Sequence, residues 1–166
     1  GVNYGKLKNK FIDERTEFIT NLIKKGDNKF NYHFFGIYNE EPRWNYEFNN
    51  ELKISKTALN LSRGGPSKYC SSNRIASLMG NGILPFIDEK IQYQDFFNNG
   101  EIITYKNVDD LLIKLEKIIS NKKELVRRSK NAKKSYFSYF ENTIVAESII
   151  TSIFDTPKKY KYIWNK

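Results

Sequence analysis

The chain has 166 residues, of which 39% are apolar and 15% aromatic, and its formal net charge is +9. This composition excludes disordered, collagen-like and low-complexity chains, because bulky aromatic side chains recover the entropy lost on ordering only when they pack. A single cysteine, Cys70, and a single histidine, His33, exclude a disulfide framework and a zinc cluster. No apolar run reaches the roughly 18 residues that cross a bilayer, so we expect one soluble, cytoplasmic domain with no metal and no cofactor.

The positive charge lies almost wholly in two stretches near the C-terminus. Residues 121–138 carry a net charge of +6 and residues 156–166 carry +4, which leaves the rest of the chain near neutrality. This distribution suits an anionic membrane surface or a polyanion, although a solvated helix face or compositional drift would produce it too. Only six of the 28 basic residues are arginine, whose guanidinium group makes paired hydrogen bonds to phosphates and bases. Sequence-specific recognition of a nucleic acid therefore has weak support.

Helices and strands alternate along the predicted chain. Apolar residues at helical spacing predict a first helix over about 8–25, and the short aromatic run 30–38 predicts a buried strand that Pro42 breaks. The next expected elements are a helix at 46–55, a strand at 57–61, a helix at 73–79 capped by Ser72, a strand at 83–87, a short helix at 92–97 and a strand at 102–105. Three helices follow, one starting at Asp109 and Asp110, one at about 121–139 and one at about 142–154.

This order predicts the fold class. Strands that alternate with helices through short loops are typical of a parallel sheet covered on both faces, so we expect a doubly wound, Rossmann-like α/β domain over 1–155. Residues 156–166 form a basic, aromatic tail. The chain opens with a loop, Gly1 to Gly5, that leads straight into a helix. Either the sheet starts at residue 30, or a first strand lies upstream; we favour the second.

The densest group of polar residues lies in and after the loop that follows the 57–61 strand. Ligands of open parallel sheets bind beyond the carboxyl ends of the strands, where this loop lies. Glycines let backbone amides approach a ligand, and a helix N-terminus supplies N–H groups and partial positive charge. We interpret the group as a candidate diphosphate cradle, although such a loop before a capped helix is also common without a ligand. Its members are Arg63, Gly64, Gly65, Lys68, Ser71, Ser72, Asn73 and Arg74.

Several short runs in this part of the chain carry a family resemblance. They are Ala58-Leu-Asn-Leu-Ser-Arg63, Ser72-Asn-Arg-Ile-Ala-Ser-Leu-Met-Gly-Asn-Gly82, Ile83 to Asp88, Asn99-Gly100 and the helix opening Val108-Asp-Asp-Leu-Leu. Their order resembles the C-terminal, nucleotide-sugar-binding half of GT-B glycosyltransferases of the group 1 type. The resemblance covers about residues 1–155, and its specific part is confined to 57–110.

The resemblance implies a hexosyl-type, metal-independent glycosyltransferase that moves a sugar from a nucleoside diphosphate to an acceptor glycan or lipid, as in cell-envelope polysaccharide synthesis. The donor diphosphate would lie over the N-terminus of the 73–79 helix. Arg63, Lys68 and Arg74 would stabilise the departing diphosphate, whose charge grows as the glycosidic bond breaks. An N-terminal acceptor-binding domain of the same protein is implied as a partner, so this part alone would be inactive or nearly so.

One position departs from the family pattern. Many relatives carry a glutamate that bonds the nucleotide ribose where this sequence has Ser77. A serine is shorter and neutral, so ribose binding would be rearranged, weaker or supplied by Asp88 or Glu89. The fold assignment is unaffected, but the usual donor geometry is in doubt.

Other candidate residues favour structural roles. His33 lies in a predicted strand and is more simply a packed residue than a base, and Cys70 has no evident histidine partner. Trp44 and Tyr38 could stack on a nucleobase, but covering the sheet edge is the simpler role. No Asp-x-Asp sequence occurs, which disfavours the metal-dependent class of glycosyltransferase. A noncatalytic sugar-nucleotide-binding domain and a nucleic-acid-binding module remain alternatives, although the covered strands favour no nucleic acid partner.

The basic C-terminal region has two possible roles. Lysines between 122 and 134, with the interleaved lysines and aromatics of 158–164, could hold the chain peripherally on the anionic inner face of a membrane. The helix could equally be a solvated face, and the tail could wrap onto another domain.

Overall fold

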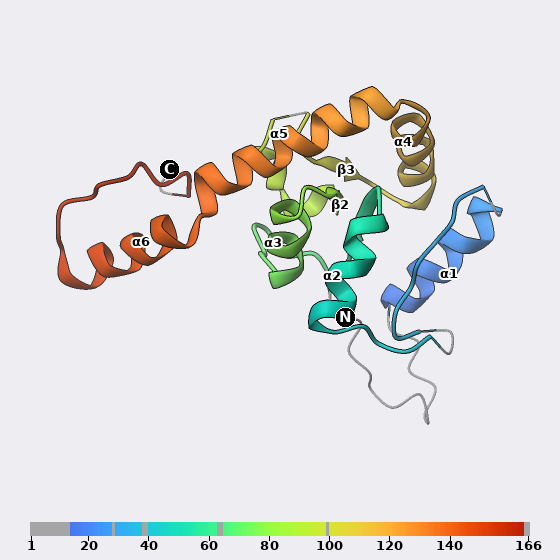
Figure 1. The fold of residues 1–166 in the computed structure, drawn as a ribbon, viewed down its shortest axis with the longest axis horizontal. Helices are drawn as coiled ribbons and strands as arrows, with labels where there is room; N and C mark the ends of the chain where they lie inside the picture. Colours follow the sequence, from blue (N-terminus) through green and yellow to red (C-terminus); the bar gives the residue numbers. More distant parts are fainter. Residues whose placement is uncertain (1–13, 28, 38–39, 63–64, 99, 165–166) are drawn as a thin grey trace.

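The computed structural model describes residues 14–27, 29–37, 40–62, 65–98 and 100–164. Six α-helices, three strands and two 3-10 turns are found in these ranges (Figure 1). They are α1 (Glu14–Gly26), α2 (Asn45–Ile54), β1 (Thr57–Asn60), α3 (Asn73–Gly80), β2 (Leu84–Asp88), η1 (Glu89–Ile91), η2 (Tyr93–Asp95), β3 (Ile103–Tyr105), α4 (Val108–Ser120), α5 (Lys122–Phe140) and α6 (Asn142–Phe154).

The strands form a parallel sheet in the order β1-β2-β3. Phe86 of the central strand pairs with Leu59 on one side and Ile103 on the other. A parallel strand covered on both faces needs apolar side chains in succession rather than in alternation, and Leu84 to Ile87 provide them. The sequence therefore predicted these three strands and their class of sheet correctly.

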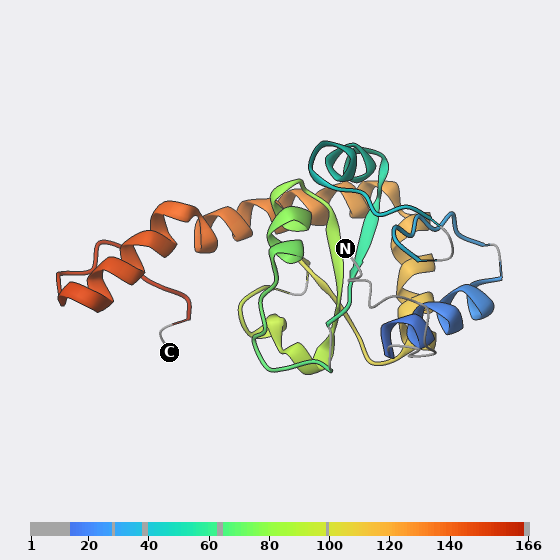
Figure 2. The same ribbon diagram turned by 90° about the horizontal axis from the view of Figure 1, so that it is seen from below.

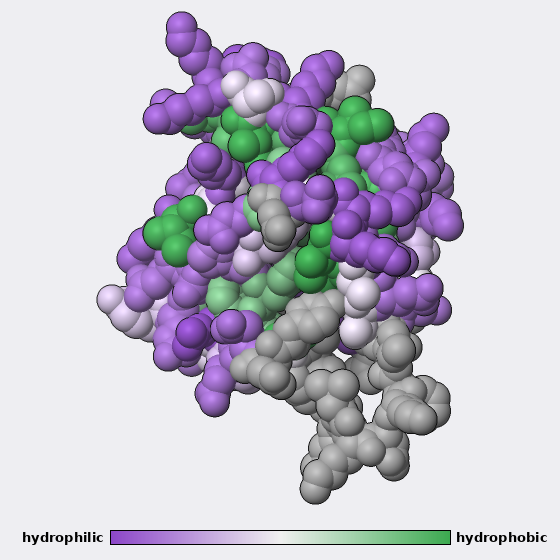
Figure 3. Space-filling model, turned by 90° about the vertical axis from the view of Figure 1, so that its right-hand side faces the viewer, coloured by the Kyte–Doolittle hydropathy of each residue, from purple (hydrophilic) through white to green (hydrophobic). Residues whose placement is uncertain are grey.

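Helices cover both faces of the sheet. Figure 2 shows the strands between α3 on one side and α1 with α4 on the other, and α5 packs on α3 and β2. Met79, Leu84 and Ile87 are fully buried at the centre of this arrangement. On the face that carries α1 and α4, apolar surface appears only as separate patches between hydrophilic side chains (Figure 3).

The sheet order corresponds to one half of a doubly wound sheet. Each strand lies beside the next strand in the chain, and the reversal of direction that defines double winding is not found among the residues that the structure describes. The α/β class with a parallel sheet is confirmed. Double winding stays a prediction.

The expected strand at 30–38 is wrong for the part that the structure describes. Residues 29–37 form no ladder with β1, although they run near it. Phe30 and Tyr32 pack against the apolar core instead, and a cavity of about 540 Å³ lies between this segment and β1. Backbone groups that a cavity separates cannot pair, so aromatic content alone does not make a strand here.

The ends of several elements depend on side chains that periodicity does not reveal. The expected helix at 92–97 is wrong, because this range holds only the short 3-10 turn η2, which Gln92, with its left-handed backbone (φ 58°), separates from η1. Helix α4 is capped by Asn107, whose Oδ1 accepts the Asp110 amide at 3.0 Å, and Asn121 caps α5 in the same way. The predicted helix at 46–55 is confirmed as α2.

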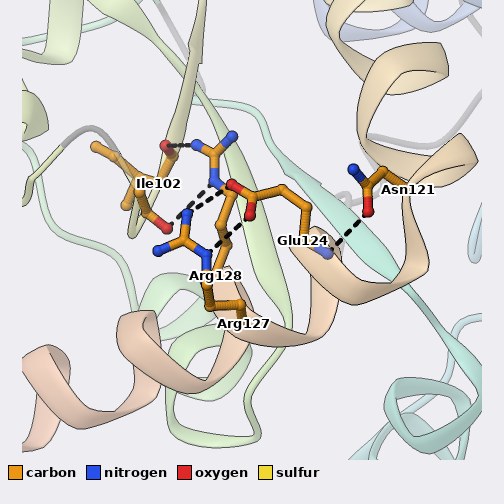
Figure 4. A network of polar contacts seen from close by, with 6 residues as sticks. Ile102, Asn121, Glu124, Arg127 and Arg128 are labelled. Atoms are coloured by element: carbon orange, nitrogen blue, oxygen red, sulfur yellow. Dashed lines mark hydrogen bonds and ion pairs between the residues drawn. The ribbon is translucent and has the colours of Figure 1, made fainter.

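A polar network fastens the start of α5 to the loop before β3 (Figure 4). Arg128 donates from Nη2 to the Ile102 carbonyl oxygen at 2.9 Å and from Nε to the Gly100 carbonyl oxygen at 3.2 Å. Burial lowers the pKa of Arg128. Its neighbour Arg127 pairs with Glu124 on the surface. From this anchor α5 carries the chain away from the sheet to α6 (Figure 1).

Candidate functional site

The carboxyl end of β1 meets the first turn of α3. Asn60, the last residue of β1, is buried, and its Oδ1 accepts a hydrogen bond from the Ser72 hydroxyl at 3.3 Å. Arg74 donates from Nη1 to the Leu61 carbonyl oxygen at 2.9 Å. These two contacts dock the helix N-terminus on the strand end, where ligands of parallel sheets bind. The structure places Ser72 and Arg74 at this strand end, and their role in binding stays a prediction.

Two arginines stand close to each other at this point. Arg74 is half-buried, and Arg15 of α1 is 6% exposed. Burial lowers the pKa of Arg74, and the positive charge of Arg15 lowers it further. Two enclosed guanidinium groups that repel each other are stabilised by an anion placed between or beside them. The pair therefore brings two positively charged side chains to this end of the sheet.

The N-terminus of α3 is not closed by its own cap residue. Ser72 has the extended backbone of an N-cap, but its side chain makes no capping hydrogen bond, because the hydroxyl bonds Asn60 instead. The positive end of the helix dipole therefore lies beside Arg74, with no acidic residue in the first turn. Asn73 is exposed at this helix start. Such an end attracts anions.

Ser77 turns its hydroxyl back onto its own helix. The Ser77 Oγ donates to the Asn73 carbonyl oxygen at 3.0 Å, one turn earlier. This is the usual resting bond of a serine inside a helix. The hydroxyl is therefore already engaged at the position where relatives of the resembled family carry a glutamate.

The loop between β1 and α3 is tied to the turns that follow β2. Tyr69 has a left-handed backbone (φ 58°), its N–H donates to the Ile91 carbonyl oxygen at 2.8 Å, and its hydroxyl donates to Asp95 Oδ2 at 2.6 Å. The hydrogen bond to the Asp95 carboxylate raises the pKa of Tyr69. Lys68 lies over the Tyr69 ring, with Nζ 4.8 Å from its centroid. Strained residues of this kind persist only where surrounding contacts hold them.

The two predicted glycines of this loop have different outcomes. Gly65 has φ +85°, which favours glycine, and a side chain there would meet no atom within 4 Å. The space beside Gly65 is therefore open. Gly64 and Arg63 lie outside the described residues.

The end of β2 contributes a carboxylate that is partly engaged. Asp88 Oδ1 accepts the Lys90 amide at 2.9 Å and so begins η1. Glu89 is half-buried, and its carbonyl oxygen accepts from Gln92 and Gln94. Both lie on a strand end next to β1, as expected. Ser71 is exposed before the helix cap.

The cavity of about 540 Å³ opens beside the arginine pair. Arg15 and Arg74 line it together with Leu61, and its other walls come from α1, α2, β1 and segment 29–43. A second hollow of about 630 Å³ lies at the opposite end of the sheet, where Lys56, Lys122, Lys130 and Lys133 line it. Of the predicted site residues that the structure describes, Arg74 lines the first cavity, and none lines the second.

The remaining candidates have ordinary surroundings. His33 is partly exposed rather than packed as expected, and its Nδ1 lies 3.4 Å from Glu51 Oε2. Cys70 is an exposed free thiol. Trp44 is 61% exposed just before α2, and Tyr38 lies outside the described residues. Within the described ranges no cluster of three His, Cys, Asp or Glu residues could hold a metal ion.

Sequence reasoning missed two residues of this region. Arg15 stands four residues before Ile19 and seven before Leu22, on the inward stripe of α1, and a charge on an apolar stripe was a usable signal. Tyr69 had no such signal, because its contacts with Asp95 and Ile91 cross more than twenty residues of chain.

Comparison with known proteins gives one match. The model of a family described as "Glycosyl transferase-like" matches residues 14–151. No curated protein and no solved structure matches the chain.

Proposed function

Because the chain belongs to the glycosyl transferase-like family, we propose that it is the donor-binding part of a transferase that takes its sugar from a nucleoside diphosphate. The observation that carries this proposal is the meeting of Arg74, Arg15 and the start of α3 at the carboxyl end of β1. Two linked phosphates have the negative charge and the size that suit a helix N-terminus beside arginine side chains.

The diphosphate lies over the first turn of α3 in this proposal. The amides of Ser72 to Arg74 face it, and the open space at Gly65 lets the loop approach it closely. Arg63, Lys68 and Ser71 belong to the same loop and complete the cradle on the other side. Lys68 reaches it by leaving the face of Tyr69, a surface contact that costs little to break.

The chemistry needs charge stabilisation at the leaving group. The bond between the anomeric carbon and the diphosphate oxygen breaks, and its electron pair passes to the diphosphate. The oxygen of an acceptor hydroxyl forms the new bond to the anomeric carbon and releases its proton, so the products are the glycoside, the nucleoside diphosphate and a proton. Cationic side chains at Arg63, Lys68 and Arg74 stabilise the growing negative charge more than the bound donor, so they lower the barrier. This role requires no metal ion.

The nucleoside part of the donor is held differently from the resembled family. The Ser77 hydroxyl is engaged with the Asn73 carbonyl, so we assign the ribose contact to Asp88 or Glu89 at the end of β2. One oxygen of Asp88 already accepts the Lys90 amide, and the carboxylate has a second oxygen for a ribose hydroxyl.

The acceptor belongs to another part of the protein in this proposal. We assign it to an N-terminal domain of a GT-B arrangement that presents a glycan or a lipid-linked saccharide from the cytoplasmic side of a membrane. The region described here then binds the donor and shows little or no hexosyl transfer alone.

Calorimetric titration tests donor binding directly. The chain is titrated with UDP, with GDP and with a short single-stranded oligonucleotide in about 150 mM salt, because salt suppresses nonspecific binding to phosphates. We expect one of the two nucleotides to bind and the oligonucleotide not to bind. Binding of the oligonucleotide alone would replace the proposal by a nucleic-acid-binding module, and no binding of either nucleotide would overturn it.

A matched pair of arginine variants locates the site. Arg74→Ala is expected to weaken nucleotide binding by about 1–3 kcal/mol, or roughly 5- to 150-fold, the range of a charge-assisted contact. Arg128→Ala is the control, because Arg128 is also a partly buried arginine that donates to main-chain carbonyls, but it lies at the start of α5. Equal affinities of the two variants would remove Arg74 from the site.

A further inference from the structure

Helix α6 presents its largest apolar side chains to solvent. Ile149, Ile150, Ile153 and Phe154 are between 52% and 69% exposed. Their spacing places them on one side of the helix, and we name these four residues the apolar stripe. Isolated exposed apolar residues are common on protein surfaces, but four that adjoin along a helix mark an interaction surface.

Polar contacts with the tail lie along one edge of the apolar stripe, because Glu147 and Thr151 stand seven and three residues before Phe154 on α6. Glu147 Oε2 accepts the Tyr162 hydroxyl at 2.9 Å, and Thr151 Oγ1 lies 3.2 Å from the same hydroxyl. Trp164 stacks on Tyr162 and on Phe140 at the end of α5. These contacts hold the tail beside the apolar stripe, so the stripe and the tail can meet one surface together.

Three lysines lie in the segment that Tyr162 holds against α6. Lys158, Lys159 and Lys161 are exposed, and we name them the lysine triplet. The Lys159 amide donates to Glu147, and Lys158 Nζ lies 5.9 Å from the centre of the Tyr162 ring, so the segment runs back beside the helix. Asp155 is the one acidic residue between the apolar stripe and the lysine triplet.

We propose that α6 and the 155–164 segment form a docking surface for an anionic lipid membrane. An apolar stripe that enters the acyl boundary, with lysines and aromatic rings beside it at the headgroup level, is the chemistry of an interfacial helix. Thirteen residues extend about 20 Å, so the helix lies in the plane of the surface. No helix in the described part of the chain is long and apolar enough to cross a bilayer.

Charge complementarity favours a membrane over a protein partner. Lysines are depleted at the cores of protein interfaces, whereas they accumulate where a protein meets acidic headgroups. Here the lysine triplet immediately follows the apolar stripe, and Tyr160, Tyr162 and Trp164 interleave with it. The proposal is independent of the transfer reaction.

Sedimentation with lipid vesicles tests the proposal. The chain is mixed with vesicles of phosphatidylcholine alone or with about 30% phosphatidylglycerol, and the bound fraction is measured. We expect binding to the anionic vesicles, at least about tenfold weaker binding to the neutral ones, and loss of binding in high salt. No binding to anionic vesicles, or equal binding to both kinds, overturns the proposal.

Paired variants distinguish binding through the apolar stripe from nonspecific binding through any exposed apolar side chain. Ile153→Ser with Phe154→Ser, and separately Lys158→Gln with Lys159→Gln and Lys161→Gln, are each expected to reduce binding about tenfold or more. The control is Ile54→Ser with Ile113→Ser, because these isoleucines are equally exposed on α2 and α4. A stripe variant that binds like the control overturns the proposal, as would be seen if another protein domain covers α6.

Tryptophan fluorescence tests the proposal while the apolar stripe and the lysine triplet stay unchanged. Trp164 lies beside the proposed surface, and Trp44 lies before α2. In the Trp44→Phe variant the fluorescence therefore reports Trp164 alone. We expect quenching by anionic vesicles that carry brominated acyl chains, and unchanged emission in their presence overturns the proposal.

Discussion

The sheet region and α6 place the same residue types in opposite environments. Ile87 in β2 is 0% exposed, whereas Ile153 in α6 is 67% exposed. In the sheet, helices cover both faces, so apolar side chains are buried whichever face they point to. In α6, Glu147 and Thr151 bond Tyr162 of the tail, and the neighbouring apolar side chains stay exposed in the described part of the chain. Whether an apolar face is buried therefore depends on which elements the rest of the chain packs against it.

The largest expected effect lies in the unfolding free energy of matched isoleucine variants. Ile87→Ala is expected to lower stability by about 2–5 kcal/mol, because the fully buried side chain leaves a cavity in a packed core. Ile153→Ala is expected to change stability by less than about 0.5 kcal/mol, because its side chain is already in water. Urea denaturation of both variants measures the difference. A comparable loss in Ile153→Ala would mean that α6 is packed inward in solution.

A local effect is expected when the tail loses its contact with α6. Tyr162→Phe removes the hydroxyl that Glu147 and Thr151 share, so the 156–164 segment should separate from the helix more often. We expect amide exchange in this segment to become several-fold faster while exchange in β1, β2 and β3 stays the same. Unchanged exchange in the tail would show that stacking on Trp164 alone holds it.

The smallest effect is a pH dependence at the junction of β3 and α4. Burial would raise the pKa of Asp110, but the hydrogen bonds from the Lys114 ammonium and the Lys106 amide lower it more, so the net shift is downward. The folded state therefore gains stability from the carboxylate above its unfolded pKa of about 4, and this gain is lost as the pH falls through the lower folded pKa.

Asp110→Asn is expected to cost at most about 1 kcal/mol at pH 7, the scale of a partly exposed ion pair. The deficit should shrink toward pH 2, where the wild-type carboxyl is protonated as well. Urea denaturation across this range measures it. If the stability difference stayed constant down to pH 2, it would arise from the shape and hydrogen bonding of the introduced asparagine side chain and not from the lost charge of Asp110.

Local pattern predicted most of the fold. The apolar run at β2 and the serine before α3 carry their own signals, because strand burial and helix starts depend on neighbouring residues. The expected cap of α3 is wrong in one respect, since the Ser72 hydroxyl bonds Asn60 instead of the helix. The aromatic segment near Tyr32 misled the prediction, because a strand requires a partner strand and the sequence does not state which backbone is within reach. The left-handed backbone of Gln92 was equally unpredictable, because no glycine or asparagine marks that position.

The candidate site was predicted in part. Ser72 and Arg74 follow from the helix start, and the structure brings them to the end of β1. Arg15 was missed although its place on an apolar stripe was visible, because surface charge is the usual fate of a helical arginine. The outward stripe of α6 was missed for a different reason: periodicity locates a stripe, but it does not tell which stripe the rest of the chain covers.

Amide hydrogen exchange of the chain with and without the nucleoside diphosphate that binds it tests the central claim most directly. We predict slower exchange at the first turn of α3, over 72–76, and in the preceding loop over 65–71, because the diphosphate accepts hydrogen bonds from the amides of 72–74 and holds the helix start and the loop against opening. Helices α5 and α6 should exchange as before. Protection confined to the lysine-rich hollow around Lys130, with none at α3, would contradict the claim that the donor lies at the carboxyl end of β1.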